Sequence, residues 1–194
     1  MIDLDIVTPY FRSREVDEAL AKRGVDVIAP AKVARHLDMP ALTPQVLGAL
    51  QQDDRWIILD VGGDEQGARA LSQYSAILRQ HGYVMYLVVN PYRPFTADTE
   101  GIREAVTQIE RTSRLLVTGL VGNPNLLGST ATGHLRDGIA VIGLAGRQLG
   151  MPVVFTTVER RLLGAAREIL PPEMPILPLE RFFVMPWAES DELT

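Results

Sequence analysis

The chain has 194 residues, of which 46% are hydrophobic and 22% charged, and this length and composition are typical of one globular domain. Its net charge of −5 argues against nucleic-acid binding through a basic patch and against an anionic membrane surface, since both need clustered cations. The absence of cysteine excludes disulfides, thiolate catalysis and cysteine zinc sites, and it fits a reducing cytoplasm.

Short apolar runs alternate with helical patterns along the whole chain. In chain order the pattern predicts a strand at 2–7, a helix at 17–23, an apolar run at 25–29, a helix from Thr43-Pro44, a strand at 56–59, a helix at 65–80, a strand at 83–89, a helix at 97–111, a strand at 114–120, a helix at 132–149, a strand at 152–156, a helix at 159–170 and a last strand at 182–185.

Local signals support several of these boundaries. Gly24 suits the position after a helix, and Thr43 with Pro44 suits an N-cap followed by the first helical residue. His81 before Gly82 is interpreted as a residue at a helix C-terminus rather than a ligand. No apolar stretch approaches the roughly 20 residues that span a bilayer.

Strands that are apolar throughout and are separated by helices predict a parallel sheet buried on both faces. The fold class is therefore α/β, with three layers, a mostly parallel sheet and helices on both of its faces. We expect a single domain over residues 1–187 and a polar tail at 188–194. The proline-rich segment 171–178 predicts an extended surface connection.

Ligands of open parallel sheets bind at the carboxyl ends of the strands, so residues just after each apolar run are informative. Asp60 ends one such run, and Gly62-Gly63 follows. A carboxylate there can hold a metal-bound water, and glycines let the backbone approach a phosphate. The alternative, which spacing alone favours, is a tight turn with Asp64 capping the next helix.

Asp3 and Asp5 lie on one side of the first strand, because side chains repeat their direction at every second residue. Taken alone, a solvated strand end explains this pair at least as well as a site. The other strand-end segments are 8–12, 90–94, 122–125 and Thr156-Thr157.

Several of these segments resemble the MinD/ParA/CobQ class of P-loop ATPases. The run 2–7 with 9–12 resembles their Asp-x-Asp strand, and 57–63 resembles their Walker B and switch II segment. The segment 117–123 looks like the strand whose following asparagine, here Asn123, contacts the base, and 88–96 is similar to a strand and loop of bacterial members. The resemblance covers residue 2 to about 160 and implies a P-loop NTPase-like fold.

The chain departs from that family at its most diagnostic motif. Family members place a strand, a Gly-rich lysine loop and a helix before the Asp-x-Asp strand. Only Lys22 and Lys32 are lysines here, and neither lies in a Gly-rich segment. The backbone cradle and lysine that neutralise phosphate charge are therefore missing from these 194 residues.

Two interpretations of this departure stay open. In the one we favour, Met1 is an internal methionine and the loop is encoded upstream. The missing strand would then leave a gap or edge in the sheet. In the other, the product is short and is a non-catalytic protein-interaction module that keeps the fold.

The resemblance implies a set of roles. Asp60 would be the Walker B acid at the Mg²⁺ site, Asp5 the switch acid near the attacking water, and Asn123 the base contact, with Asp3, Gly62 and Gly63 in support. ATP and Mg²⁺ are expected in an intact family member and not with this chain alone. A homodimer or a partner protein is also implied.

Other constellations have less support. His36, His81 and His134 lack metal-ligand spacing, and neither a Gly-x-Ser-x-Gly elbow nor a dinucleotide fingerprint is present. Gly138, Gly143 and Gly146 fall within one predicted helix and indicate close helix–sheet packing.

Overall fold

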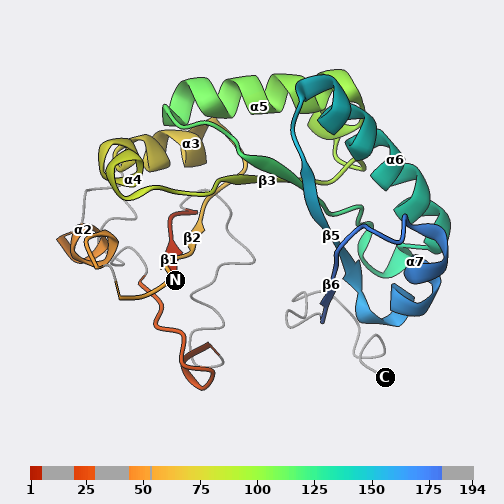
Figure 1. The fold of residues 1–194 in the computed structure, drawn as a ribbon, viewed down its shortest axis with the longest axis horizontal. Coiled ribbons are helices and arrows are strands. Elements are labelled where there is room, and N and C mark those ends of the chain that lie inside the picture. Colours follow the sequence, from red (N-terminus) through yellow and green to blue (C-terminus); the bar gives the residue numbers. More distant parts are fainter. Residues whose placement is uncertain (6–19, 29–43, 53, 181–194) are drawn as a thin grey trace.

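The computed structural model describes residues 1–5, 20–28, 44–52 and 54–180. Within these residues the strands form two separate parallel sheets (Figure 1). The smaller sheet pairs β1 (Ile2–Asp3) with β2 (Leu59–Asp60), and Ile28 adds an isolated bridge to Ile2. The larger sheet has the order β3-β4-β5-β6. The predicted α/β class, with parallel sheets and helices packed against them, is confirmed.

The four-stranded sheet is built in chain order with a helix after each of its first three strands. Its strands are β3 (Tyr86–Val89), β4 (Gly119–Gly122), β5 (Val153–Glu159) and β6 (Ile176–Leu179). The helices between them are α5 (Thr99–Ser113), α6 (Thr132–Leu149) and α7 (Leu163–Ile169), with short 3-10 turns η3 (Pro94–Thr96), η4 (Leu127–Ser129) and η5 (Arg160–Leu162).

One hydrophobic core lies between this sheet and its helices. Ile102 and Val106 of α5 and Ile142 of α6 pack against Val89 of β3 and Leu120 of β4. All five side chains are buried, as the period of apolar residues along α5 predicts. Since α5, α6 and α7 share this core, they cover the same face of the sheet (Figure 1).

The opposite face of the four-stranded sheet is exposed at its two edge strands, β3 and β6, whereas Val121 of β4, the register partner of Val88, is only 2% exposed. Tyr86 and Val88 of β3 are 44% and 57% exposed, and Leu177 and Leu179 of β6 are 47% and 40% exposed. We call these four residues the open face. Tyr86 also meets Phe155 of β5 edge-to-face, with ring centroids 6.2 Å apart. The side chains of β3 are therefore buried on one side only, although its sequence is apolar on both.

A second core supports the smaller sheet. Ile2 and Leu4 are buried with Leu71, Tyr74 and residues of three helices that lie on one side of β1 and β2. These helices are α2 (Pro44–Leu50), α3 (Glu65–Ser72) and α4 (Ser75–His81). Met85, just before β3, packs against both cores, and α3 lies against α5. The helix layer is thus continuous although the sheet is not.

The expected buried strand at 56–59 is wrong in extent and burial. Only Leu59 and Asp60 form β2, while Trp56 is 97% and Ile58 62% exposed. The physical reason is that Ile57 and Leu59 pack against the core formed with α2, α3 and α4, so the alternate side chains of Trp56 and Ile58 point away from that core.

Two further expectations are corrected. The single helix at 65–80 is two helices, because the backbone of Tyr74, with φ −100° and ψ 2°, departs from helical geometry between α3 and α4. The proline-rich segment is not merely a connection, since residues 176–179 form β6 and pair with β5. Proline is tolerated there because β6 is an edge strand of the described sheet.

Other boundaries agree with the sequence. Helix α6 has the predicted bounds, His81 is the last residue of α4, and Gly24 adopts a positive φ of 76°. A Cβ on Gly146 would lie 3.2 Å from Val153 of β5, which confirms the predicted close helix–sheet packing there, whereas a Cβ on Gly138 would lie 2.7 Å from Pro124 in a loop. A Cβ on Gly143 would meet only Arg147 of the same helix. Thr43 and the predicted strand at 182–185 lie outside the described residues. None of the described helices is long and apolar enough to cross a membrane.

Replacing Ile142 by alanine should lower the free energy of unfolding by about 2–5 kcal/mol, because it leaves a cavity in the hydrophobic core between α6 and the four-stranded sheet. Leu144→Ala on the same helix is the matched control, since Leu144 is 43% exposed, and it should cost about 1 kcal/mol or less. Urea unfolding followed by circular dichroism measures both. Equal losses from the two substitutions would contradict this assignment of the core.

Candidate functional site

Three predicted carboxylates meet where β1 and β2 end. Asp3 and Asp60 are register partners in the parallel pair, so their side chains project from the same face. Asp3 is fully buried, and its Oδ1 accepts a hydrogen bond of 3.1 Å from the backbone N–H of Asp5. Asp5 and Asp60 are only half-buried. Asp3 therefore orients the chain, while Asp5 and Asp60 are the carboxylates that solvent and ligands can reach.

The two predicted glycines lie beside these carboxylates and differ in their surroundings. A Cβ on Gly62 would lie 3.2 Å from Oδ1 of Asp5, so the Asp5 carboxylate rests against the Gly62 backbone. A Cβ on Gly63 would meet nothing within 4 Å, and Gly63 is exposed. The backbone at Gly63 is consequently open to the approach of a ligand.

The turn after Gly63 starts α3 by a capping interaction. The Asp64 carboxylate accepts a hydrogen bond of 2.9 Å from the backbone N–H of Gly67. This bond satisfies one of the free donors at the helix N-terminus. The turn-and-cap interpretation of 60–64 is thus confirmed for Asp64, and it coexists with the carboxylates of Asp5 and Asp60.

The second group of polar residues lies at the carboxyl ends of β3, β4 and β5. The Asn90 side chain donates to the Asn125 carbonyl at 2.8 Å, and its Oδ1 accepts from the N–H groups of Tyr92 and Asn125 at 3.1 and 3.2 Å. Asn90 thereby ties the loop after β3 to the loop after β4. The sequence indicates that Asn90 follows a strand, but it does not predict that Asn90 connects these two loops.

Asn123, the predicted base contact, follows β4 and is half-buried. Its backbone N–H donates to Val89 at 2.8 Å, and its Oδ1 accepts from the Thr157 hydroxyl at 2.8 Å. The hydroxyl of Thr156 donates to the Gly122 carbonyl at 3.0 Å. The two threonines of β5 therefore fix the end of β4 and the direction of the Asn123 amide.

Sequence reasoning missed the role of Arg161. Its guanidinium donates to the carbonyl of Thr130 at 2.9 Å and to that of Gly128 at 3.2 Å, and it pairs with Glu159 at 2.8 Å. These contacts hold the loop between β4 and α6 against the end of β5. A lone arginine in a helical pattern carries no sequence signal for this contact.

Tyr92 fastens the loop after β3 to the first turn of α6. Its hydroxyl donates to the His134 carbonyl at 2.9 Å, and the two rings meet edge-to-face at 5.3 Å. Partial burial, and to a lesser degree the negative charge of Asp137, raises the pKa of Tyr92 above its usual value. A tyrosine phenol is protonated at neutral pH at its usual pKa, and the upward shift extends its donor role to more alkaline pH.

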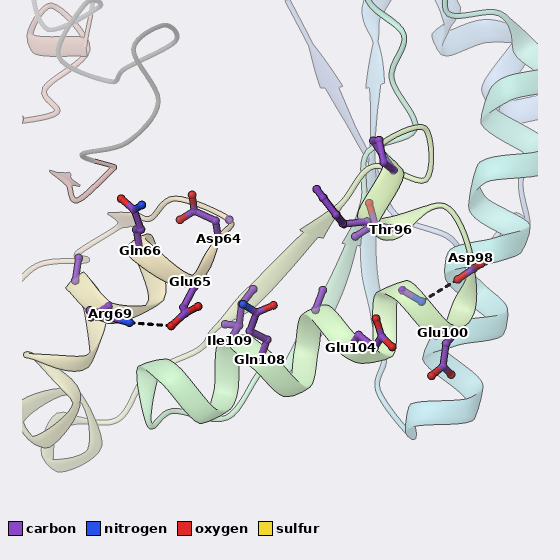
Figure 2. Close-up of a pocket in the computed structure, with 16 residues that line it drawn as sticks. Asp64, Glu65, Gln66, Arg69, Thr96, Asp98, Glu100, Glu104, Gln108 and Ile109 are labelled. Atoms are coloured by element: carbon purple, nitrogen blue, oxygen red, sulfur yellow. Dashed lines mark hydrogen bonds and ion pairs between the residues drawn. The ribbon is translucent and has the colours of Figure 1, made fainter.

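An open groove of about 1040 Å³ begins at Gly63 and runs between α3 and α5 (Figure 2). Most of its carboxylates have local partners. Asp98 accepts from Gly101, Glu65 pairs with Arg69, and Glu100 pairs with Arg103. Of the six predicted site residues, Gly63 lines this groove. The groove is therefore an acidic surface beside the carboxylates of β1 and β2 rather than a pocket around them.

The predicted site residues thus form two groups on two sheets. Asp3, Asp5, Asp60 and Gly62 lie together, with Gly63 at their rim, whereas Asn123 belongs to the four-stranded sheet. In the described part of the chain, no three His, Cys, Asp or Glu side chains are arranged to hold a metal ion by themselves. The assignment of Asp60 to a metal site stays a prediction.

Comparison with known proteins yields no match, whether with family models, with curated proteins or with solved structures.

Gly67→Ala should destabilise the fold by about 1–3 kcal/mol, although alanine favours helices over glycine. The added Cβ would overlap the Gly62 carbonyl and push apart the turn that holds Asp5 and Asp60. Gly63→Ala is the matched control, with an expected change within about 0.5 kcal/mol, because its Cβ enters open space. Urea denaturation measures both, and a neutral Gly67→Ala would contradict the packing of this turn.

Proposed function

We propose that the chain is a MinD/ParA-type nucleotide-binding domain whose phosphate-binding loop is not among these 194 residues. The observation that carries the proposal is the convergence of Asp5, Asp60 and Gly62 at the ends of two paired parallel strands. That is where parallel sheets bind ligands, and the resemblance of segments 2–7 and 57–63 to ATPase motifs concerns the same residues.

Each residue has a role in the proposed site. Asp60, as the half-buried acid at the end of β2, would hold a water on Mg²⁺. Asp5, held by its backbone bond to Asp3, would orient the attacking water. The open backbone at Gly63 would approach a phosphate, and Asn123 would hydrogen-bond the base.

The donor set fits a Mg²⁺–nucleotide complex better than a resident metal. Mg²⁺ commonly takes one or two carboxylates from the protein and its other ligands from phosphates and water. A single acid such as Asp60 suits that arrangement, and a preformed cluster of three acids is not required. Bound with the nucleotide, Mg²⁺ would neutralise charge on the phosphates.

The proposal also sets a limit on activity. Neither Lys22 nor Lys32 lies in a Gly-rich segment, so the groups that neutralise most phosphate charge have to be supplied from outside these 194 residues. The 194-residue chain should therefore not bind MgATP measurably by itself.

A non-catalytic interaction module is the second candidate. It is favoured by exposed apolar side chains, which are Trp56 and Ile58 just before β2 and Val88 in β3. Exposed apolar surface of this kind is typical of protein–protein contacts. In this case the strand-end carboxylates would be structural.

Calorimetric titration with MgATP tests the first proposal. We expect no binding by the 194-residue chain, and binding by a chain extended upstream in frame if that sequence encodes a Gly-rich lysine loop. In the extended chain Asp60→Asn should weaken Mg²⁺-dependent binding at least about tenfold, roughly 1.4 kcal/mol. Glu168→Gln on the exposed side of α7 should leave it unchanged.

Three outcomes would count against the proposal. A stop codon in the upstream frame would favour the interaction module. An extended chain with the lysine loop that fails to bind MgATP would refute the nucleotide site. Micromolar binding by the 194-residue chain would show that the loop is dispensable.

A further inference from the structure

A buried hydroxyl of β5 orients the side-chain amide of Asn123. The Asn123 Oδ1 accepts a hydrogen bond of 2.8 Å from the hydroxyl of Thr157, which is only 9% exposed. The oxygen and the NH2 group of a side-chain amide leave the same planar carbon in different directions. Because the oxygen is turned toward Thr157, the NH2 group of Asn123 is directed away from it.

The surrounding hydrogen bonds favour this orientation over the reverse one. A threonine hydroxyl carries one hydrogen, and Thr157 has two acceptors in reach, Oδ1 of Asn123 at 2.8 Å and the Gly122 carbonyl at 3.3 Å. The Gly122 carbonyl already accepts from the Thr156 hydroxyl at 3.0 Å. With the amide reversed, Asn123 would donate to Thr157, and Thr157 would have to donate over the longer distance. The observed orientation keeps the shorter and better hydrogen bond.

The NH2 group of Asn123 is left as a donor at the carboxyl end of β4, where parallel sheets bind ligands. Asn123 is half-buried, and no group in the described part of the chain accepts a hydrogen bond from its NH2. Asn125 also uses its oxygen within the protein, since its Oδ1 accepts from the Leu127 N–H at 2.6 Å. Both asparagines of the loop after β4 therefore commit their oxygen to the protein, which leaves N–H donors for a ligand.

A donor at this position limits what Asn123 can recognise on a base. The purine ring nitrogen N7 is an acceptor in both adenine and guanine, whereas the amino group at position 6 of adenine is a donor. An asparagine that offers its oxygen and its NH2 together can pair with the amino group and N7 of adenine. An asparagine whose oxygen is committed to a neighbouring hydroxyl pairs with N7 alone.

We propose that Thr157 is a positioning residue of the candidate nucleotide site, holding the Asn123 amide so that its NH2 donates to N7 of a purine base. The site then takes purine nucleotides with either an amino group or a carbonyl at position 6, and it does not select adenine through its amino group. The ligand in this inference rests on the proposed function. The orientation of the amide rests only on the contacts between β4 and β5.

NMR spectroscopy of the 194-residue chain without ligand tests the orientation. We expect only a weak nuclear Overhauser effect between the Asn123 NH2 protons and Hβ of Thr157, because the oxygen lies between them. Thr157→Val removes the hydroxyl and should shift the Asn123 NH2 signals and strengthen this effect, since the amide can then reverse. Thr157→Ser keeps the hydroxyl and is the matched control, which should leave the signals close to those of the parent chain.

Purine nucleosides test the ligand, because they carry the base without the phosphates that require the lysine loop. We expect adenosine and inosine to shift the Asn123 NH2 signals at similar millimolar concentrations. The analogue 7-deazaadenosine lacks the N7 acceptor and should need at least about tenfold more. In Thr157→Val this difference between adenosine and its analogue should fall to about threefold or less.

The outcomes separate this inference from the proposed function. A strong Overhauser effect in the parent chain, unchanged Asn123 signals in Thr157→Val, or equal binding of adenosine and 7-deazaadenosine overturns the inference even if an extended chain binds MgATP. The absence of any nucleoside shift overturns it as well. MgATP binding by the extended chain then shows that the proposed function stands without this contact, and failure to bind shows that both have failed.

Discussion

The burial of one face of the four-stranded sheet under α5 and α6 is the constraint on which the rest of the molecule depends. Val89, Leu120, Ile102 and Ile142 have almost no exposed surface, and they join β3 and β4 to both helices. Because this packing fixes the register of the strands, it also fixes where each strand ends. The polar residues that follow the strands are thus brought together at the carboxyl ends of the strands. The apolar contacts that place them there are made by other residues.

Side-chain hydrogen bonds then fix the loops that follow the carboxyl ends of the strands. Asn90 joins the loops after β3 and β4, and Thr157 holds the Asn123 amide. At the smaller sheet the carboxylate of the buried Asp3 accepts a hydrogen bond from the backbone N–H of Asp5 and so fixes the position of Asp5. Polar groups that are fixed in this way lose little conformational entropy on binding a ligand, which suits a preorganised site. The same hydrogen bonds also stabilise the fold, so the candidate site and the surrounding structure depend on the same contacts.

Much of the local structure could be predicted because it depends on near neighbours in the chain. The period of Ile102, Val106 and Ile109 predicts the buried side of α5, and the residues bounding 132–149 predict α6. The Asp64 cap follows from an acid placed before a helical pattern. Of the candidate site, the grouping of Asp3, Asp5, Asp60 and Gly62 follows from strand alternation and strand ends. The positions of Asn90 and Arg161 as cross-links do not, since their partners are distant in sequence.

By itself, then, the sequence determined the α/β class, most helices, the parallel strands and the residues that end them. Only the tertiary structure decided that Trp56 and Ile58 are exposed, that Tyr74 splits a helix, and that 176–179 pairs as β6. An apolar run predicts a strand whose faces can be buried, but burial also requires a neighbouring element to supply the cover. The described residues supply that cover on one face of each sheet and leave the edges of β2 and β3 free.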